Sequence, residues 1–271
     1  MVKFAQVVLG PAGSGKSTYC AELQRYCNDK RRVLHVINLD PAAEEFKYAV
    51  SVDIRDLISV DEVGEEMSLG PNGALVYCME FMLHNLEWLE DKLDAFVDND
   101  YVVFDLPGQI ELYTHFPFMR ELISKLHRWD FRVQALYFLD SQFMADSTKF
   151  FGGCITALSA MIQLEIPHLN IMSKMDLTRD MTKRKVDEYM DADIDMLISD
   201  LSRTTPPRFM KLNNAMGSLL DDFGMVSFVP LDITDDDSIA TLLLMVDLAL
   251  QYEDEVDQSR EVPDEVDECS E

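Results

Sequence analysis

Short apolar runs recur along the chain, and most of them end at a turn-forming or charged residue. Runs of about four to eight residues that are rich in Val, Ile, Leu and Phe predict strands buried on both faces. Such runs predict strands at residues 4–9, 33–39, 101–104, 133–139, 168–172 and 225–229.

Apolar residues spaced three and four apart predict helices between these strands. The clearest are a helix after the first strand, a long helix carrying Met79 to Phe96, and helices over 115–128 and 147–165. Strands that alternate with helices favour a parallel arrangement. We therefore expect an α/β fold, a mostly parallel sheet with helices on both faces.

Three stretches add detail to this alternation. Residues 53–69 are acidic and irregular, and they end at Gly70-Pro71-Asn72-Gly73, whose Gly-Pro and Asn-Gly pairs predict a turn. Residues 182–223 carry two helical patterns, which predict a helical insertion outside the sheet that serves as a lid, a docking surface or ordinary core. Thr234 to Asp237 resembles a capping box for a final helix. With this helix at its end, we expect a single domain over residues 1–252.

The composition agrees with a globular protein of 271 residues, of which 48% are hydrophobic. No run approaches the 18 or so apolar residues of a membrane span, and the N-terminus leads directly into a strand, unlike a signal peptide. Five scattered cysteines favour a reducing compartment and a packing role rather than metal binding. These features predict a cytoplasmic protein that does not enter membranes.

The charge is strongly negative, with a formal net value of −27. A surface this acidic repels nucleic acids and anionic membranes, so neither is an expected partner. Ten acidic residues against the single Arg260 lie within residues 253–271. We expect this segment to be a disordered acidic tail, either solvating or used for docking.

A glycine-rich segment lies between the first predicted strand and the first predicted helix. Residues 10–18 match the pattern G-x-x-x-x-G-K-[ST]. Glycines let backbone N–H groups approach phosphate oxygens, and the helix N-terminus favours the same anion. Lys16 would reach the β- and γ-phosphates and Ser17 would bind Mg²⁺, whereas a glycine-rich turn without a ligand is the plainer alternative. The predicted phosphate-binding residues are Gly13, Ser14, Gly15, Lys16, Ser17 and Thr18.

Two aspartates follow the second and third predicted strands. Asp40 and Asp105 are placed to hold Mg²⁺ directly or through water, although Asp40 could equally cap the turn before Pro41. Gly108 could give its N–H to the γ-phosphate. Gln109 could both accept from and donate to an attacking water molecule.

A candidate base-reading segment follows the fifth predicted strand. A carboxylate accepts paired hydrogen bonds from the N1–H and amine of guanine, whereas adenine offers a lone pair there. Asp176 therefore predicts GTP over ATP, and the stem of Lys174 could cover the ring. The alternative is a strand-to-helix cap, and the Leu231-Asp232 backbone is a vaguer candidate for contacting guanine O6. The predicted base-binding residues are Ser173, Lys174, Met175 and Asp176.

Five motifs together resemble those of the GPN-loop GTPases, over nearly all of residues 1–252. The resemblance implies a P-loop NTPase fold of the G-domain type and Mg²⁺-dependent hydrolysis of GTP. Ser173 departs from the Asn or Thr usual in GTPases, and Leu231-Asp232 from the usual Ser-Ala type. The motifs are residues 10–18, Asn38-Leu39-Asp40-Pro41-Ala42, Gly70-Pro71-Asn72, Asp105 to Leu112, and Ser173-Lys174-Met175-Asp176.

The same resemblance implies roles that the residues alone do not indicate. Members of the family dimerise through their GTPase domains, and eukaryotic paralogues pair with one another, although a homodimer is possible here. Asn72 would act in trans, in the partner's site, near the γ-phosphate and the attacking water. The resemblance also implies work in the assembly and nuclear import of RNA polymerase II, with RNA polymerase II subunits as partners, from the cytoplasm and with shuttling to the nucleus.

Two other function classes stay open at this point. The chain could be a binding module in which GTP orders a scaffold surface with little turnover. The presence of Gln109 argues against this module. The pairing of paralogues in the family argues for it, because catalysis could then be confined to one subunit. A small-molecule kinase is more distant. It would need arginines brought to an acceptor, and only Arg203 and Arg208 in the insertion suggest this.

Overall fold

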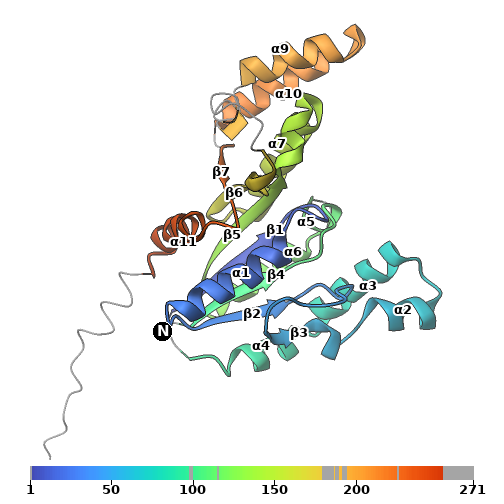
Figure 1. Cartoon of the computed structure of the whole chain (residues 1–271). Coiled ribbons are helices and arrows are strands. Elements are labelled where there is room, and N and C mark those ends of the chain that lie inside the picture. The colour runs from blue at the N-terminus through green and yellow to red at the C-terminus, as the bar shows by residue number, and fades with distance from the viewer. Residues whose placement is uncertain are drawn as a thin grey trace, which may run out of the picture.

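The computed structural model describes residues 2–97, 100–114, 116–178, 186, 189–190, 194–224 and 226–252. Within this part of the chain one seven-stranded sheet forms, in the order β3-β2-β4-β1-β5-β6-β7, and all of its neighbouring strands are parallel (Figure 1). The predicted parallel α/β fold is confirmed. The strands are β1 (Lys3–Leu9), β2 (Leu34–Asn38), β3 (Val50–Asp53), β4 (Tyr101–Asp105), β5 (Phe131–Asp140), β6 (His168–Ser173) and β7 (Phe228–Pro230).

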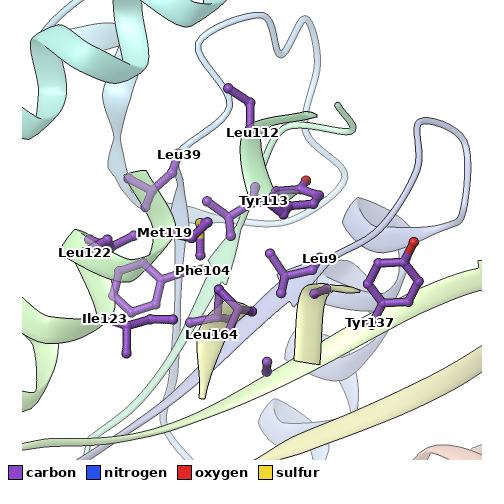
Figure 2. Packing of buried hydrophobic residues seen from close by; sticks show 14 of the residues in the cluster. Leu9, Leu39, Phe104, Leu112, Tyr113, Met119, Leu122, Ile123, Tyr137 and Leu164 are labelled. Atoms are coloured by element: carbon purple, nitrogen blue, oxygen red, sulfur yellow. The ribbon is translucent and has the colours of Figure 1, made fainter. Parts of the chain in front are cut away.

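Helices cover both faces of the sheet. Alternate residues of β1 enter different cores: Phe4 and Val8 pack with α1 (Lys16–Asp29) and α11 (Asp236–Leu250). Leu9 belongs to the larger core on the other face, part of which is shown in Figure 2. The helices that contribute to that larger core include α3 (Pro71–His84), α4 (Leu86–Leu93), α6 (Phe118–Arg128) and α7 (Ser147–Leu164).

Residues 50–85 differ from the sequence-based prediction. The short edge strand β3 was missed, and the acidic stretch contains the helix α2 (Val60–Met67), whose N-cap is Ser59. The segment predicted as a turn instead starts a helix, because Gly70 is the N-cap of α3 and proline is well suited to its first turn. Asn85 divides the predicted long helix into α3 and α4, with a backbone at φ −122° and ψ 36°.

The predicted insertion is helical where the structure describes it. The helices α9 (Ile194–Thr204) and α10 (Met210–Phe223) pack on each other and on α7, away from the sheet (Figure 1). Their contact is close, because a Cβ atom on Gly217 would lie 2.4 Å from Cδ1 of Ile198. Most of the first predicted helical pattern, before residue 194, lies outside the described residues.

The other helical predictions need smaller changes. The segment predicted as one helix over 115–128 is the helix α6, preceded by the short α5 (Glu111–Thr114). At the last helix, Asp235 rather than Thr234 is the N-cap, and its side chain accepts from the N–H of Asp237. No helix in the described part of the chain has the length and hydrophobicity needed to cross a bilayer.

The C-terminal helix is tied to the amino ends of the strands. Arg32, just before β2, makes two hydrogen bonds to Asp247 of α11, at 2.5 and 2.8 Å. Its guanidinium also lies 4.3 Å from the ring centroid of Tyr101 and 4.0 Å from that of Tyr252. Tyr252 further packs against Phe4, the second residue of β1. These contacts fix the chain up to residue 252.

A candidate nucleotide-binding site

The glycine-rich segment forms a tight loop between β1 and α1, as predicted. Gly10, Gly13 and Gly15 have φ angles of 136°, 74° and 92°, a region that L-amino acids with side chains rarely adopt. At Gly10 a Cβ atom would also lie 2.4 Å from the carbonyl oxygen of Phe138. The loop therefore depends on its glycines, and it leads into the N-terminus of a 14-residue helix.

Lys16 places a cation inside this loop. Its Nζ donates to the carbonyl oxygens of Gly10 and Pro11, at 3.0 and 3.1 Å. Burial lowers the pKa of Lys16, and the nearby Asp105 and Asp40 carboxylates partly oppose that change. An ammonium that is largely removed from water and held by neutral carbonyls is well placed to exchange them for phosphate oxygens.

Asp105 ends β4 beside the loop, in register with Val8 of β1 and Asn38 of β2. Its side chain is buried, and Oδ2 accepts a hydrogen bond of 2.8 Å from Oη of Tyr48. Oδ1 is buried without a hydrogen-bond partner among the described residues. Burial raises the pKa of Asp105, while Ser17, Tyr48 and Lys16 act in the opposite direction. A buried carboxylate oxygen without a partner calls for a cation or water.

Asp40 makes the turn cap that is the alternative to metal binding. Its Oδ1 accepts from the N–H of Ala42 at 2.9 Å, which is the turn cap. Burial raises its pKa, the Ala42 bond lowers it, and the charge of Asp105 raises it further, so the two carboxylates influence each other. The turn cap uses one oxygen of the carboxylate, and the metal role of Asp40 stays a prediction.

These residues fit Mg²⁺. No group of three or more His, Cys, Asp or Glu side chains that could hold a metal occurs among the described residues. Mg²⁺ beside a nucleotide usually takes one or two protein oxygens and completes its shell with phosphate and water. The unpartnered oxygen of Asp105 and the neighbouring Ser17 hydroxyl provide such a set. Magnesium binding stays a prediction.

The segment after β4 lies close against the phosphate loop. A Cβ atom on Gly108 would lie 2.6 Å from Cα of Ala12, so this close approach needs glycine. The next residue, Gln109, donates from Nε2 to Oδ1 of Asn72 at 3.0 Å. The two side chains predicted to position water thus meet within a single chain, and the predicted role of Asn72 in a partner's site is untested.

The predicted base-reading segment follows β6. Oγ of Ser173 is buried and donates to the carbonyl oxygens of Ser14 and Leu139, at 2.6 and 3.2 Å. Despite its departure from the usual Asn or Thr, Ser173 therefore ties this segment to the phosphate loop. Lys174 has a positive φ of 58° and makes an ion pair of 2.6 Å with Asp140.

Asp176 lies in the short helix η3 (Met175–Thr178) and is partly exposed. Within the described part of the chain, no hydrogen bond or ion pair joins its carboxylate to another residue. The backbone N–H groups of Leu231 and Asp232 are not available for the suggested contact with guanine O6. The N–H of Leu231 donates to Met172 at 2.8 Å and that of Asp232 to Ser238 at 3.1 Å, so neither is free for guanine O6.

A cavity of about 960 Å³ borders the phosphate loop at Pro11. Pro11 and Ile110 line one part, and residues of α7 and η3 line another. It includes neither Lys16 nor Asp105. The predicted phosphate site is therefore defined by the backbone geometry of the loop and not by this cavity.

The sequence-based reasoning missed Tyr48 and the groups around it. Tyr48 lies between β2 and β3, in a stretch without regular structure. The nearby Arg55 makes an ion pair with Asp53 at 2.6 Å and stacks on Phe46 at 4.4 Å. The available signal was a pair of aromatic residues, Phe46 and Tyr48, in a polar stretch, which indicates a packed segment. The spacing of these residues gave no indication that Tyr48 reaches Asp105.

Comparison with known proteins identifies the family. A family model described as "Conserved hypothetical ATP binding protein" matches residues 8–252. GPN-loop GTPase 3 from Mycosarcoma maydis is 49% identical over 278 residues, covering 99% of this chain and 98% of that protein. GPN-loop GTPase 3 from Danio rerio is 48% identical over 271 residues, covering 99% and 94%.

Among solved structures, the chain resembles PAB0955, a GTPase in apo form from Pyrococcus abyssi. The TM-score is 0.74 with 24% identity, over 91% of this chain and 97% of that one. This likeness supports the fold alone. The family model and the relatives at nearly full length show more: the chain is a GTPase that binds guanine nucleotide, and it belongs to the GPN-loop GTPase family.

Proposed function

We propose that this GTPase is a Mg²⁺-dependent switch that acts as a dimer. The observation that carries the magnesium part is the buried Oδ1 of Asp105, which has no partner among the described residues. When bound, Mg²⁺ would neutralise charge on the β- and γ-phosphates. Ser17 and Asp105 would hold it, with Asp40 acting through water. Magnesium titration of GTP binding and hydrolysis tests this, and activity that persists unchanged in EDTA overturns it.

The chain's own groups would prepare GTP for attack by water. Amides of the glycine loop and Lys16 bind the phosphates, and Gly108 presents its N–H at the γ-phosphate. Asn72 and Gln109 position the water, with Asn72 contributed by the partner subunit. Within the single chain Gln109 donates to Oδ1 of Asn72 at 3.0 Å, which supports a shared task for the two side chains, whereas the contribution of Asn72 by the partner rests on the family resemblance. Mixed dimers that carry Asn72→Ala in one subunit test which subunit supplies it.

Asp176 would select the base. Its two carboxylate oxygens would match the paired donors of guanine. Ser173, Lys174 and Met175 would shape this end of the site. Competition between GTP and ATP for the purified protein tests the assignment, and equal affinities would show that it is wrong.

The cellular role that we propose is the assembly and nuclear import of RNA polymerase II. The support is the GPN-loop resemblance and the relatives named GPN-loop GTPase 3. In this role the chain pairs with a paralogous GPN-loop GTPase in the cytoplasm, contacts RNA polymerase II subunits and shuttles to the nucleus. Depletion of the chain should leave RNA polymerase II subunits in the cytoplasm. Normal nuclear levels of these subunits after depletion would contradict the role.

One observation favours a second candidate, a GTP-ordered scaffold with little turnover of its own. In the single chain the Gln109 amide already donates to Asn72, and so is engaged before any water arrives. Steady-state hydrolysis with and without the partner paralogue separates the two functions. A rate that remains negligible in the complex supports the scaffold.

A further inference from the structure

Tyr48 makes a buried contact with the carboxylate expected to hold magnesium. Its Oη donates to Oδ2 of Asp105 at 2.8 Å, and the tyrosine is only 7% exposed. The other oxygen of the same carboxylate, Oδ1, has no partner among the described residues. The two oxygens of Asp105 are thus distinguished: Oδ2 is held by Tyr48, whereas Oδ1 has no hydrogen-bond partner among the described residues, although the Ser17 hydroxyl lies near the carboxylate.

The segment that carries Tyr48 is held in place on one side by Arg55. This guanidinium donates to the carbonyl oxygens of Ala43 and Glu44, at 2.9 and 3.1 Å. It also lies 4.4 Å from the ring centroid of Phe46, and that ring lies 5.2 Å from the ring of Tyr48. Arg55 therefore fixes the backbone before Tyr48 and the ring beside it.

On its other side the segment is attached to α1. Gln24 donates to the carbonyl oxygen of Ala49 at 2.9 Å and accepts from its N–H at 2.8 Å. With both flanks fixed, the hydroxyl of Tyr48 has little freedom to leave Asp105. A ligand carboxylate held by a second group in this way is oriented before the metal arrives.

We propose that Tyr48 is a positioning residue for magnesium: its hydroxyl holds Oδ2 of Asp105 so that Oδ1 faces the metal and its water. This inference rests on the proposed magnesium dependence. A purely structural role for Tyr48 would depend on its ring, which packs in the core beside Phe46. The positioning role depends on the hydroxyl alone, so the two can be separated by Tyr48→Phe.

The test compares Tyr48→Phe with a matched control on the same strand as Asp105. Tyr101, at the other end of β4, accepts a buried hydrogen bond of 2.7 Å from Gln6. Tyr101→Phe therefore removes a comparable buried hydroxyl far from the metal. For each protein, GTP binding is measured by calorimetry over a series of Mg²⁺ concentrations and in EDTA.

The Mg²⁺ midpoint is the Mg²⁺ concentration that gives half of the maximal change in GTP affinity. We expect Tyr48→Phe to raise this midpoint by about tenfold, the usual consequence of losing a group that orients a metal ligand. GTP affinity in EDTA should stay at the wild-type level. Tyr101→Phe should leave the Mg²⁺ midpoint unchanged. A wild-type midpoint in folded Tyr48→Phe overturns the positioning role.

A second pair of variants covers a failure of Tyr48→Phe to fold. Tyr48→Gln keeps a hydrogen-bond donor and Tyr48→Met does not. We expect the Mg²⁺ midpoint of Tyr48→Met to be higher than that of Tyr48→Gln, by the same factor. Equal midpoints for this pair overturn the proposal. If the wild-type protein binds and hydrolyses GTP equally well in EDTA, the proposed magnesium dependence itself fails, which is a different result.

Discussion

The side-chain amide of Gln109 donates to the carboxamide oxygen of Asn72, 3.0 Å away in the same chain. One residue follows β4 beside the phosphate loop, and the other lies in the first turn of α3. Groups that act as a unit in catalysis show strongly non-additive mutational effects. This contact therefore predicts how the two residues behave together.

We expect Asn72→Ala and Gln109→Ala each to lower kcat for GTP about 10- to 100-fold, and the double variant to be little worse than either. Single-turnover hydrolysis with each of the four proteins measures this. GTP affinity serves as the control and should change little. Additive losses in kcat would mean that the residues act independently.

The Ser173 hydroxyl predicts a second effect. Ser173→Ala leaves the buried carbonyl oxygen of Ser14 without this donor, and such a loss costs about 1–3 kcal/mol. Because the bond supports the phosphate loop, GTP and GDP should weaken together, while the preference for GTP over ATP stays the same. Ser173→Thr, which retains the hydroxyl, is the matched control. A loss of base preference in the alanine variant would place Ser173 at the base instead.

Asp176→Asn tests base recognition. The asparagine amide offers a donor where the carboxylate offered an acceptor, so it should reject guanine and accept xanthine, which has a carbonyl in place of the amine. We expect GTP to bind about 100-fold more weakly and XTP to bind more tightly than to the wild type. Competition assays with the two nucleotides measure the change. An unaltered GTP affinity would remove Asp176 from the base site.

Asp105 predicts a pH-dependent stability effect. Burial raises the pKa of this carboxyl in the folded state. Its protonated form therefore favours folding below the unfolded-state pKa, and this contribution is lost as the pH rises through the folded-state pKa. Asparagine is neutral throughout and avoids the cost of a buried charge. Without nucleotide and Mg²⁺, Asp105→Asn should be more stable than the wild type near pH 7, by on the order of 1 kcal/mol.

Thermal unfolding between pH 4 and 8 should show that the gain in Asp105→Asn shrinks towards acid pH. Asp53 is the opposite control: burial opposes the charge there, but hydrogen bonds from Arg55 and Asn38 outweigh it and lower its pKa. Asp53→Asn should therefore lose stability near neutral pH. If the stability of the wild type and of Asp105→Asn changes equally with pH, burial of the charged Asp105 carboxylate does not destabilise the folded protein.

Gly108→Ala tests the close approach to the phosphate loop. An added Cβ atom would lie 2.6 Å from Cα of Ala12, which is backbone and cannot turn aside. The loop must shift, so we expect at least tenfold weaker GTP binding in a protein that remains folded. Gly152→Ala, where a Cβ atom meets nothing within 4 Å, is the control. Wild-type affinity in Gly108→Ala would show that the loop tolerates the shift.

The parallel fold could be predicted because its signals are local. Six of the strands lie in mainly apolar runs, and β1, the glycine loop and α1 follow one another without interruption. The short edge strand β3 was missed, because only Val52 of its four residues is buried and no apolar run marks it. At Gly70 the turn chemistry was misjudged, since Gly-Pro serves equally well as an N-cap followed by the first residue of a helix.

Within the site, motif spacing could place residues at strand ends but could not give their contacts. Asp40, Asp105 and Asp176 lie where the motifs predict, at the carboxyl edge of the sheet. The hydrogen bonds of Tyr48 to Asp105 and of Ser173 to Ser14 join segments 57 and 159 residues apart. Contacts of that kind are set by how elements pack, and a single sequence carries no signal for them.

Tyr252 has a practical consequence for work on this protein. Its ring packs on Phe4 and beneath Arg32, at the amino ends of the strands, whereas the glycine loop lies at their carboxyl ends. A fluorophore, affinity handle or biosensor tether joined after residue 252 would thus be anchored on the side opposite the chemistry. Immobilised from there, the molecule would present its nucleotide edge to the solution.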